Sequence, residues 1–587
     1  MSAYTKWWIF GPLIGLLALA NIRCQLFENN LFDTYAEGEW PEVTCGPDDA
    51  VYRSADGRCN DMDIKAMGMA GMRMGRNIQE DLNHQDTENL MVPNPRDVSK
   101  ELLTRTEEGV KEVPFLNYLA ASWIQFMIHD WFEHGKRDHS NPMQVPVAED
   151  DVHNMGEGHM NVGRTKADPS KDVNDGRPAT FLNENTAWWD GSQLYGSDQE
   201  TQNSLRSFED GKMTVVDGRL PIDPATGISM TGFSENWWIG LEIMHTLFVL
   251  EHNKIADMLA ASYPEWEDER LFQTARLINA AEMAKIHTVD WTPAILKNDI
   301  LRDGMFANWR GLLPSWVPRL GDPATDGIMG GKTHLEGVPF SLTEEFTAVY
   351  RMHPLLRDDF PLRDYVTDEI IGESQLEEHS FAGAAGIHEE VGLTNLFYSF
   401  GRTKPGLLVL NNFPTFLTNF NREPGGGVVD LAAVDILRDR ERGIPRYNEF
   451  RRQIGLKAVN DFTDITPDVE QAERLRAVYN DDIEALDVMV GSFAEGYRPP
   501  GYGFGETSFQ IFIAMASRRL MADRFYTVDY RPEIYTQEGL DWIDDNNFQS
   551  VVIRNMPELA GRLENVENAF FPWDEENEWY DLKVRKL

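Results

Sequence analysis

Cysteine is scarce in this sequence. Cys24, Cys45 and Cys59 are the only three in 587 residues, and all of them lie near the amino terminus. A network of disulfides is therefore excluded for the main body of the chain. At most one local bridge can form, and we expect it to join Cys45 to Cys59. The spacing of the three cysteines matches no zinc-binding motif.

Positive charge is also in short supply. Lysine and arginine total 54 against 96 aspartate and glutamate residues, which gives a formal net charge of -42. An acidic surface of this kind repels the phosphate groups of nucleic acids and of anionic lipids, so we expect no nucleic-acid partner. The acidic residues are spread along the chain rather than gathered in one tail, which is typical of a well-solvated surface.

Long apolar runs are missing apart from one. Trp7 to Ala20 holds 14 residues without a charged side chain, which is short for a membrane span. Ala18-Leu-Ala20 could serve as a signal-peptidase site, yet the apolar pattern continues to Phe27. Three interpretations stay open: an uncleaved amphipathic helix that touches a membrane, a cleaved signal peptide, and a membrane anchor. The first favours a cytoplasmic or peripherally membrane-associated protein, and the second a secreted one.

Strand-like alternation is rare, and internal repeats and glycine-rich phosphate loops are absent. Hydrophobic residues make up 42% of the chain, enough for a large core. We expect a mainly α protein, with an N-terminal apolar helix and arm over residues 1–60 and a single large helical domain over residues 61–587. Residues 40–105 are interpreted as an irregular surface arm, and 145–180 as a polar loop. Apolar periodicity predicts helices at 117–134, 237–263, 270–297, 342–353, 391–400, 428–438, 467–493 and 507–525.

Tyr350 and His353 lie three residues apart in the segment Glu344–Leu356. On a helix this spacing puts the phenol and the imidazole on one face, one turn apart. A histidine that binds a haem iron would then hold the tyrosine near the haem edge, where an oxidised metal centre can convert it to a radical. The alternative is a pair of side chains packed in a core helix.

A second histidine stands upstream, in the apolar segment 117–134. Gln125 and His129 are four residues apart and share a helix face, with Asp130 beside them. A haem pocket would satisfy these polar groups, with His129 as acid and base in cleavage of the peroxide O–O bond and Gln125 orienting the bound oxygen species. Alternatively, His129 is a hydrogen-bonded core histidine. It could also join Asp130 and His134 in a non-haem iron or zinc site, although their spacing turns the two histidines about 140° apart on a helix.

Thr186, Trp188, Asp190 and Ser192 offer oxygen atoms at alternate positions of one short segment. They would supply two hydroxyls, a carboxylate and the backbone carbonyl of Trp188, and Asp130 would add a second carboxylate. An all-oxygen set of this kind suits Ca²⁺. The alternative is an ordinary turn.

Several motifs together resemble the animal haem peroxidase superfamily and, within it, the fatty acid α-dioxygenases. They follow the same order over nearly the whole chain, which is more specific than any one motif. The matching stretches are Tyr52–Arg58, Ala120–Trp131, Trp188–Ser192 with Tyr195–Ser197, Glu251–Asn253, Ala284–Thr292, Val349–His353, Leu437–Arg452 and Ser517–Phe525.

This resemblance implies roles for the residues that carry it. His353 would be the proximal ligand of a haem iron, and His129 the distal histidine with Gln125 beside it. Peroxide would activate the haem, which would oxidise Tyr350 to a tyrosyl radical. That radical would take a hydrogen atom from C2 of a long-chain fatty acid, and O₂ would then add to give a 2-hydroperoxy fatty acid.

The same resemblance implies that His287, Thr292 and Arg519 hold the substrate carboxylate. Such an anchor makes physical sense at the closed end of an apolar tunnel, because fixing the head group sets which carbon meets Tyr350. In relatives with ester-linked haem an acid precedes the distal histidine. Ile128 stands at that position, and Trp237 where the second acid would be, so we expect non-covalent haem b.

Pro354 follows the histidine that the resemblance makes proximal, as in cyclooxygenases, where we expect serine in plant α-dioxygenases. Two other functions are carried as alternatives. One is a plain haem peroxidase that oxidises small phenols or halides with hydrogen peroxide. The other is a haem-free adhesion or matrix protein on the same scaffold. We expect a monomer.

Overall fold

The computed structural model describes residues 31, 32, 35, 38–79, 89–154, 156–171, 179–233, 236–310, 335–421 and 428–573. The apolar run from Trp7 to Ala20, with its three interpretations, and Cys24 lie outside the described residues. Within them, no helix has both the length and the apolar character that crossing a bilayer requires.

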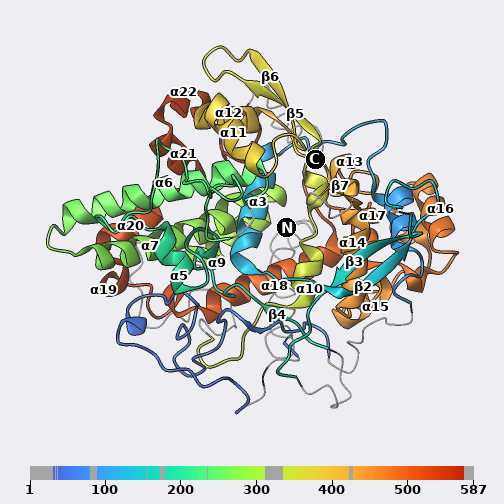
Figure 1. The fold of residues 1–587 in the computed structure, drawn as a ribbon, viewed down its shortest axis with the longest axis horizontal. Helices are drawn as coiled ribbons and strands as arrows, with labels where there is room; N and C mark the ends of the chain where they lie inside the picture. The colour runs from blue at the N-terminus through green and yellow to red at the C-terminus, as the bar shows by residue number, and fades with distance from the viewer. Residues whose placement is uncertain are drawn as a thin grey trace, which may run out of the picture.

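Helix α3 (Tyr118–Trp131) runs through the middle of the molecule. It is apolar around nearly its whole circumference, and such a helix is stable only when it is covered on all sides. Helices α6 (Ile239–Ser262) and α7 (Asp268–Ile286) pack together on one side of it, and α12 (Leu393–Arg402) contacts it as well. Figure 1 shows α14 (Leu431–Glu441) and its neighbours on the opposite side.

The other helices are mostly short. One of them, α18 (Glu506–Ala522), lies near α3 and contacts α10 (Glu344–Val349). The remaining α-helices are α2 (Pro95–Val98), α4 (Ser192–Tyr195), α5 (Gln199–Leu205), α8 (Thr292–Ile295), α9 (Asp299–Arg310), α11 (Ala382–Val391), α13 (Thr415–Thr418), α15 (Tyr447–Gln453), α16 (Val469–Val478), α17 (Val488–Ala494), α19 (Pro532–Tyr535), α20 (Gln537–Asp545), α21 (Phe548–Asn555) and α22 (Ala560–Leu563). The π-helices are η3 (Ser99–Leu103) and η4 (His287–Trp291), and the 3₁₀ helices are η1 (Asp48–Ala50), η6 (His353–Leu355), η7 (Phe462–Asp464), η8 (Ile483–Ala485), η9 (Arg524–Tyr526) and η10 (Pro557–Leu559).

The described strands form four separate antiparallel pairs. They are β1 (Met72–Arg73) with β4 (Leu182–Asn183), β2 (Asp138–Pro146) with β3 (His159–Arg164), β5 (Asp359–Arg363) with β6 (Ile370–Gln375), and β7 (Phe420–Asn421) with β8 (Val428–Val429). None of them joins into a larger sheet, so the prediction of a mainly α fold is confirmed. The hairpin of β2 and β3 enters the region predicted to be a polar loop.

The described parts of segment 40–105, residues 40–79 and 89–105, are irregular as predicted apart from η1, β1, α2 and η3, but they do not form a surface arm. Arg53, Met67 and Met74 in it are buried, and two of its glycines pack against the segment that holds Trp188. Gly57 and Gly68 have φ angles of 77° and 69°, and a Cβ atom on Gly68 would lie 2.4 Å from the Trp188 ring. Only glycine combines this backbone conformation with so close an approach. The expected disulfide between Cys45 and Cys59 is present in this segment.

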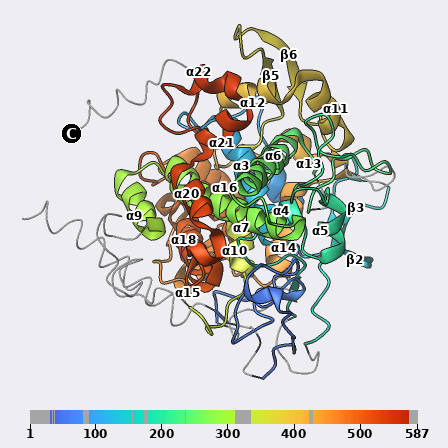
Figure 2. The same cartoon turned by 90° about the vertical axis from the view of Figure 1, so that its left-hand side faces the viewer.

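Four predicted helices differ from the observed ones. The one predicted over 342–353 ends at Val349. Segment 270–297 is continuous but passes from α7 through the π-helix η4 into α8. Segment 467–493 is divided into α16, η8 and α17. Segment 117–134 ends early because the chain becomes extended at Phe132. In Figure 2, where the left-hand side of Figure 1 faces the viewer, α6 and α7 lie in front of α3.

Candidate functional site

Tyr350 and His353 lie at the end of α10 rather than inside it. The helix ends at Val349, Tyr350 is the first residue after it, and His353 begins the 3₁₀ helix η6. The prediction of one helix carrying both side chains on one face is therefore wrong. The helix does not continue through His353 because Pro354 disfavours the α conformation at His353 and has no amide hydrogen to donate to the preceding turn.

One ring nitrogen of His353 faces a buried acid. Its Nδ1 lies 2.9 Å from Oδ2 of Asp435 in α14, and Asp435 also pairs with Arg351 at 3.0 Å. Burial favours the neutral acid, but Arg351 and His353 outweigh it and hold the pKa of Asp435 below its ordinary value. Nε2 is thereby left as the nitrogen for a metal, with a carboxylate behind the ligand as is common for metal-binding histidines.

His129 is buried on α3, and its ring stacks on Phe233 at 4.0 Å between ring centroids. Burial, with a smaller contribution from His245, lowers the pKa of His129 to about 3. The imidazole is therefore neutral at physiological pH and able to accept a proton. Its Nδ1 has no hydrogen-bond partner. Gln125, one turn away, accepts a hydrogen bond from Trp238 Nε1 at 2.9 Å, which fixes its amide.

The alternative metal site built from His129, Asp130 and His134 is not formed. His134 lies beyond the end of α3, and its Nε2 contacts both carboxylate oxygens of Glu344, at 3.1 and 2.9 Å. The Asp130 carboxylate bonds to Ser192 instead. Within the ranges that the structure describes, the one group of three ligand atoms close enough for a metal is at Cys45, Asp49 and Cys59, whose cysteines are joined in the disulfide.

The indole of Trp131, the last residue of α3, gathers three of the predicted side chains around it. Its ring centroid lies 5.1 Å from the ring of His287 and 5.4 Å from the ring of Tyr350. The guanidinium carbon of Arg519, from α18, lies 4.7 Å from the Trp131 centroid and 4.6 Å from that of Trp189. His287, Tyr350 and Arg519, which are far apart in the sequence, therefore meet at one place.

Each of these three side chains keeps one polar atom without a partner. They are Nε2 of His287, the hydroxyl of Tyr350 and Nη1 of Arg519, and all three residues are buried. Trp123 Nε1 donates to His287 Nδ1 at 3.2 Å, so the ring proton of a neutral His287 lies on Nε2. Unpaired buried polar atoms are costly, and a group of three unpaired donors is typical of a site for an anionic or strongly accepting ligand.

The charge states of the three groups suit such a ligand. Burial, reinforced by Arg519, holds the pKa of His287 well below its ordinary value, so the ring is a neutral donor. Burial raises the pKa of Tyr350 well above its ordinary value, although Arg519 acts in the other direction, so the phenol keeps its proton. Burial lowers the pKa of Arg519 to about 10, which still leaves a cation at neutral pH.

Thr292 lies just after the π-helix that begins at His287. Its hydroxyl donates to the backbone oxygen of His287 at 2.8 Å, so this hydroxyl would have to turn before it could donate to a ligand. The role predicted for Thr292 stays a prediction. Trp131 and Trp189 were not predicted to belong to the site. Trp131 directly follows Asp130, and Trp189 directly precedes Asp190, the two aspartates predicted to bind calcium.

The oxygen ligands predicted for calcium gather in one buried cluster. Asp130 Oδ1 accepts from Ser192 N at 2.7 Å, and Asp190 Oδ1 accepts from the Thr186 hydroxyl at 2.9 Å. Burial and the neighbouring Asp190 raise the pKa of Asp130 to about 8, and Asp190 Oδ2 has no hydrogen-bond partner. The Trp188 carbonyl accepts from Arg519 Nη2 at 3.1 Å, which leaves its second lone pair.

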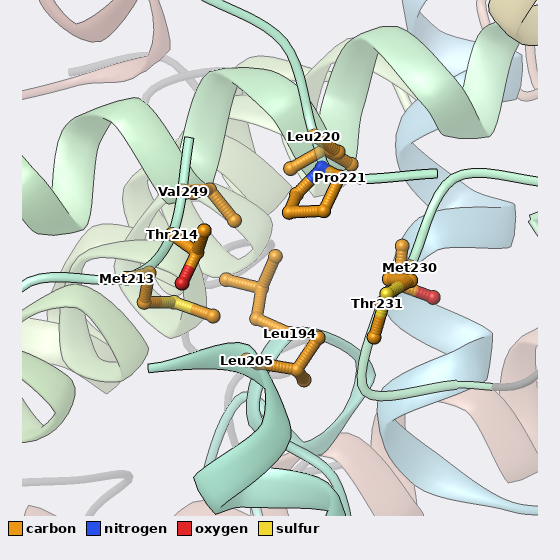
Figure 3. A pocket seen from close by; sticks show the side chains of 9 residues that line it. All are labelled: Leu194, Leu205, Met213, Thr214, Leu220, Pro221, Met230, Thr231 and Val249. Atoms are coloured by element: carbon orange, nitrogen blue, oxygen red, sulfur yellow. The ribbon is translucent and has the colours of Figure 1, made fainter. Parts of the chain in front are cut away.

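A small apolar cavity lies between α4, α5, α6 and the loop that follows α5 (Figure 3). Leucine, methionine, valine and proline side chains line most of it, with two threonines. None of the candidate residues lines this cavity. Its lining residues are Leu194, Leu205, Met213, Thr214, Leu220, Pro221, Met230, Thr231 and Val249.

Comparison with known proteins assigns this arrangement to a family. The family model described as animal haem peroxidase matches residues 52–570. The chain belongs to the animal haem peroxidase family. It is 36% identical over 579 residues to alpha-dioxygenase PIOX of Oryza sativa, covering 96% of this chain and 92% of that protein, and 37% identical over 561 residues to alpha-dioxygenase 2 of Arabidopsis thaliana, covering 92% and 87%.

Solved structures of family members have the same fold. The crystal structure of a variant of Oryza sativa fatty acid alpha-dioxygenase with palmitic acid superposes with a TM-score of 0.88 at 35% identity, covering 96% of this chain and 93% of that one. Peroxidase A from Dictyostelium discoideum, at 23% identity, has the same fold with a TM-score of 0.72, covering 89% and 99%. Its alpha-dioxygenase relatives and its family show that the chain is an oxidoreductase. The family also implies a haem.

Proposed function

We propose that this protein is a haem-dependent fatty acid α-dioxygenase that converts a long-chain fatty acid and O₂ into a 2-hydroperoxy fatty acid. The observation that carries the proposal is the convergence of three unpaired donors, on His287, Tyr350 and Arg519, around the Trp131 indole. A carboxylate satisfies two of the three donors and leaves the third, the phenol, facing the carbon next to it. The palmitic acid bound by the rice relative supports the substrate class.

The residues present fit a haem. Nδ1 of His353 faces Oδ2 of Asp435 at 2.9 Å, and Nε2 would bind the iron, which is the usual division of roles in a metal-binding histidine. His129, neutral and with an unpaired Nδ1, would accept and return a proton when the activating peroxide reacts. A bound haem supplies the oxidising power of the activating peroxide. Because Ile128 and Trp237 replace the acids of ester-linked relatives, the haem is non-covalent b-type.

The substrate head group is held by charge and by hydrogen bonds. The Arg519 guanidinium pairs with the carboxylate, and His287 Nε2 donates to it, with Thr292 as a third contact once its hydroxyl turns. The aromatic side chains around this point exclude water, which strengthens each of these interactions. Fixing the carboxylate fixes C2, and the reactive phenol needs to approach no other carbon.

Tyr350 acts by giving up and recovering a hydrogen atom. Its raised pKa keeps the oxygen protonated in the resting protein, so ionisation is not part of its role. As a phenoxyl radical it takes one hydrogen from C2, O₂ adds to the carbon radical, and the resulting peroxyl radical takes a hydrogen back from Tyr350. The residue ends each cycle ready for the next, and no reductant is consumed.

Calcium fits the cluster beside the pocket. Burial raises the pKa of both carboxyl groups, and Asp190 raises that of Asp130 further, so a cation between them would favour their charged forms. Asp130, Asp190, Thr186, Ser192 and the Trp188 carbonyl together supply only oxygen atoms. The ion would fix the C-terminal end of α3, which carries Asp130, to the segment that holds Trp189.

The test of the proposal is O₂ consumption with palmitate by the haem-loaded enzyme, with identification of the product. The Tyr350→Phe variant is expected to keep its haem and lose this activity. A plain peroxidase, the other candidate for a site with two haem histidines, would oxidise guaiacol with hydrogen peroxide and keep that activity after the same substitution.

A further inference from the structure

Arg519 does more than face the candidate carboxylate site. Its guanidinium lies over two indole rings at once, 4.7 Å from the centroid of Trp131 and 4.6 Å from that of Trp189. All three side chains are buried. A cation held over aromatic faces is attracted by their electrons, and the same field makes it harder to remove an electron from either ring.

Trp131 is the tryptophan that would give an electron to the Tyr350 radical and so become oxidised in its place. The two ring centroids lie 5.4 Å apart with the rings edge to face. Trp189 follows at 5.1 Å from Trp131, and the Tyr526 hydroxyl donates to the Trp189 backbone oxygen. Beyond Tyr526, the ring of Trp309 lies 6.3 Å away and is only partly buried. Electron transfer across gaps of this size is rapid, so these rings form a path from Tyr350 toward the surface.

The indole nitrogens of Trp131 and Trp189 have another feature in common. Both Nε1 atoms are buried without a hydrogen-bond partner. Other buried tryptophans near the site do have acceptors: Trp123 donates to His287, and Trp291 donates to the Ala120 carbonyl. A tryptophan that is oxidised next to an acceptor can release its Nε1 proton and become neutral. Trp131 and Trp189 have no such acceptor and would stay positively charged.

We propose that Arg519 confines the oxidising equivalent to Tyr350 by opposing the oxidation of Trp131 and Trp189. This inference rests on the proposed function, because it requires a radical on Tyr350. It adds a second task to the residue that holds the carboxylate: in the absence of substrate, the unpaired cation keeps the radical at the place where substrate will arrive.

The reaction that Arg519 opposes is the transfer of one electron from Trp131 to the Tyr350 radical. The phenoxyl oxygen of Tyr350 receives one electron from Trp131 and one hydronium-derived proton that is relayed from bulk solvent, and its O–H bond forms again. Trp131 is left one electron short with its Nε1–H bond intact, as a radical cation directly under a guanidinium cation. Two positive charges at this distance in a buried site repel strongly, so the exchange is unfavourable while Arg519 carries its charge.

The experiment treats the haem-loaded full chain with one equivalent of hydrogen peroxide in the absence of oxygen and fatty acid. Rapid-freeze EPR identifies the radical, and peptide mass spectrometry measures oxidation at residues 131 and 189. In the wild type we expect a tyrosyl radical that Tyr350→Phe abolishes. In Arg519→Gln we expect a tryptophan radical and at least tenfold more oxidised Trp131 and Trp189. In Arg519→Lys, which keeps the charge, the tyrosyl signal should persist.

Two controls separate charge from other effects. Arg518→Gln removes the neighbouring buried arginine of α18, which donates to the Pro339 carbonyl, and should leave the radical on Tyr350. Combining Arg519→Gln with Trp131→Phe removes the first acceptor of the hole, so oxidation at Trp189 should fall to the wild-type level. Persistence of the Trp189 oxidation in this double variant would overturn the proposed path.

A second measurement needs no variant of Arg519. A fatty acid with two fluorine atoms on C2 offers a carboxylate but no C2 hydrogen, so it neutralises the guanidinium without consuming the radical. Wild-type enzyme saturated with it should show increased oxidation of Trp131 after peroxide. If Arg519→Gln and this inhibitor both leave a tyrosyl radical and unoxidised tryptophans, the inference is wrong while the proposed function stands. If Tyr350→Phe leaves the wild-type signal unchanged, the proposed function itself fails.

Discussion

Trp123 Nε1 donates a hydrogen bond to Nδ1 of His287 across 3.2 Å. Since a neutral imidazole carries one proton, this contact places that proton on Nε2, where the structure shows no partner. The tryptophan therefore decides whether His287 offers a donor or an acceptor to a carboxylate.

Trp123→Phe removes this control and allows the proton to move to Nδ1. We expect the KM for a long-chain fatty acid to rise about 2- to 10-fold, the effect of one net hydrogen bond, with a smaller change in kcat. Steady-state O₂ uptake measures both constants. Trp542→Phe, which removes an indole that donates to Glu251 outside the site, is the matched control, and equal effects in the two variants would rule out this role for Trp123.

Arg519→Gln removes the cation of the proposed carboxylate anchor. Charge-assisted hydrogen bonds contribute about 1.5–3 kcal/mol, so kcat/KM for palmitate should fall about 10- to 100-fold. The wild type should discriminate between palmitate and the matching fatty alcohol, and the variant should lose most of that discrimination. An unchanged ratio of acid to alcohol would show that the head group binds elsewhere.

Asp435→Asn removes the negative charge behind His353 while keeping the shape of the side chain. A less electron-rich imidazole stabilises ferric iron less, so we expect a higher Fe(III)/Fe(II) midpoint potential and about 10-fold faster haem loss to an acceptor protein. Asp439→Asn, one turn further along α14 and 3.8 Å from Arg351, is the control. If the two variants have the same midpoint potential, Asp435 does not act through His353.

Stability without calcium should fall as pH rises. The folded pKa of Asp130 is about 8, above the ordinary value of 3.8, so the folded state holds a proton that the unfolded chain has released between these two pH values. Unfolding is therefore favoured progressively from about pH 4 to pH 8. Calcium should remove this dependence and bind more tightly at higher pH. Thermal melts of the wild type with chelator or calcium, compared with Asp130→Asn, measure the effect; a chelator that changes no melting temperature argues against the ion.

The long apolar helices could be predicted from the sequence, whereas breaks within helical patterns were missed. Residues 118–131, 239–262 and 268–286 form helices because their apolar side chains recur at helical spacing and are covered on several sides. The break after Val478 depends on Asn480 and Asp481, which adopt φ angles of 52° and 62°. Asparagine and aspartate tolerate this conformation without requiring it, so the pattern alone does not reveal the break.

The polar residues of the candidate site could be predicted from the sequence, whereas the aromatic residues around them could not. His287, Tyr350 and Arg519 stand in motifs that resemble the family, and the structure brings them together. Trp131 and Trp189 connect them, yet a tryptophan beside an aspartate looks like an ordinary core residue until the contacts across 58 to 388 residues of chain are known. The burial of segment 40–105 was missed for the same reason, because Gly68 is explained only by the Trp188 ring against it.

Oxygen uptake by matched wild-type and Tyr350→Phe enzymes tests the central claim most directly. With palmitate and a trace of peroxide, the wild type should consume O₂ and form 2-hydroperoxypalmitate, identified by mass spectrometry. Tyr350→Phe, with an unchanged Soret band and unchanged palmitate binding, should consume none. Continued formation of the 2-hydroperoxide by this variant would contradict the account.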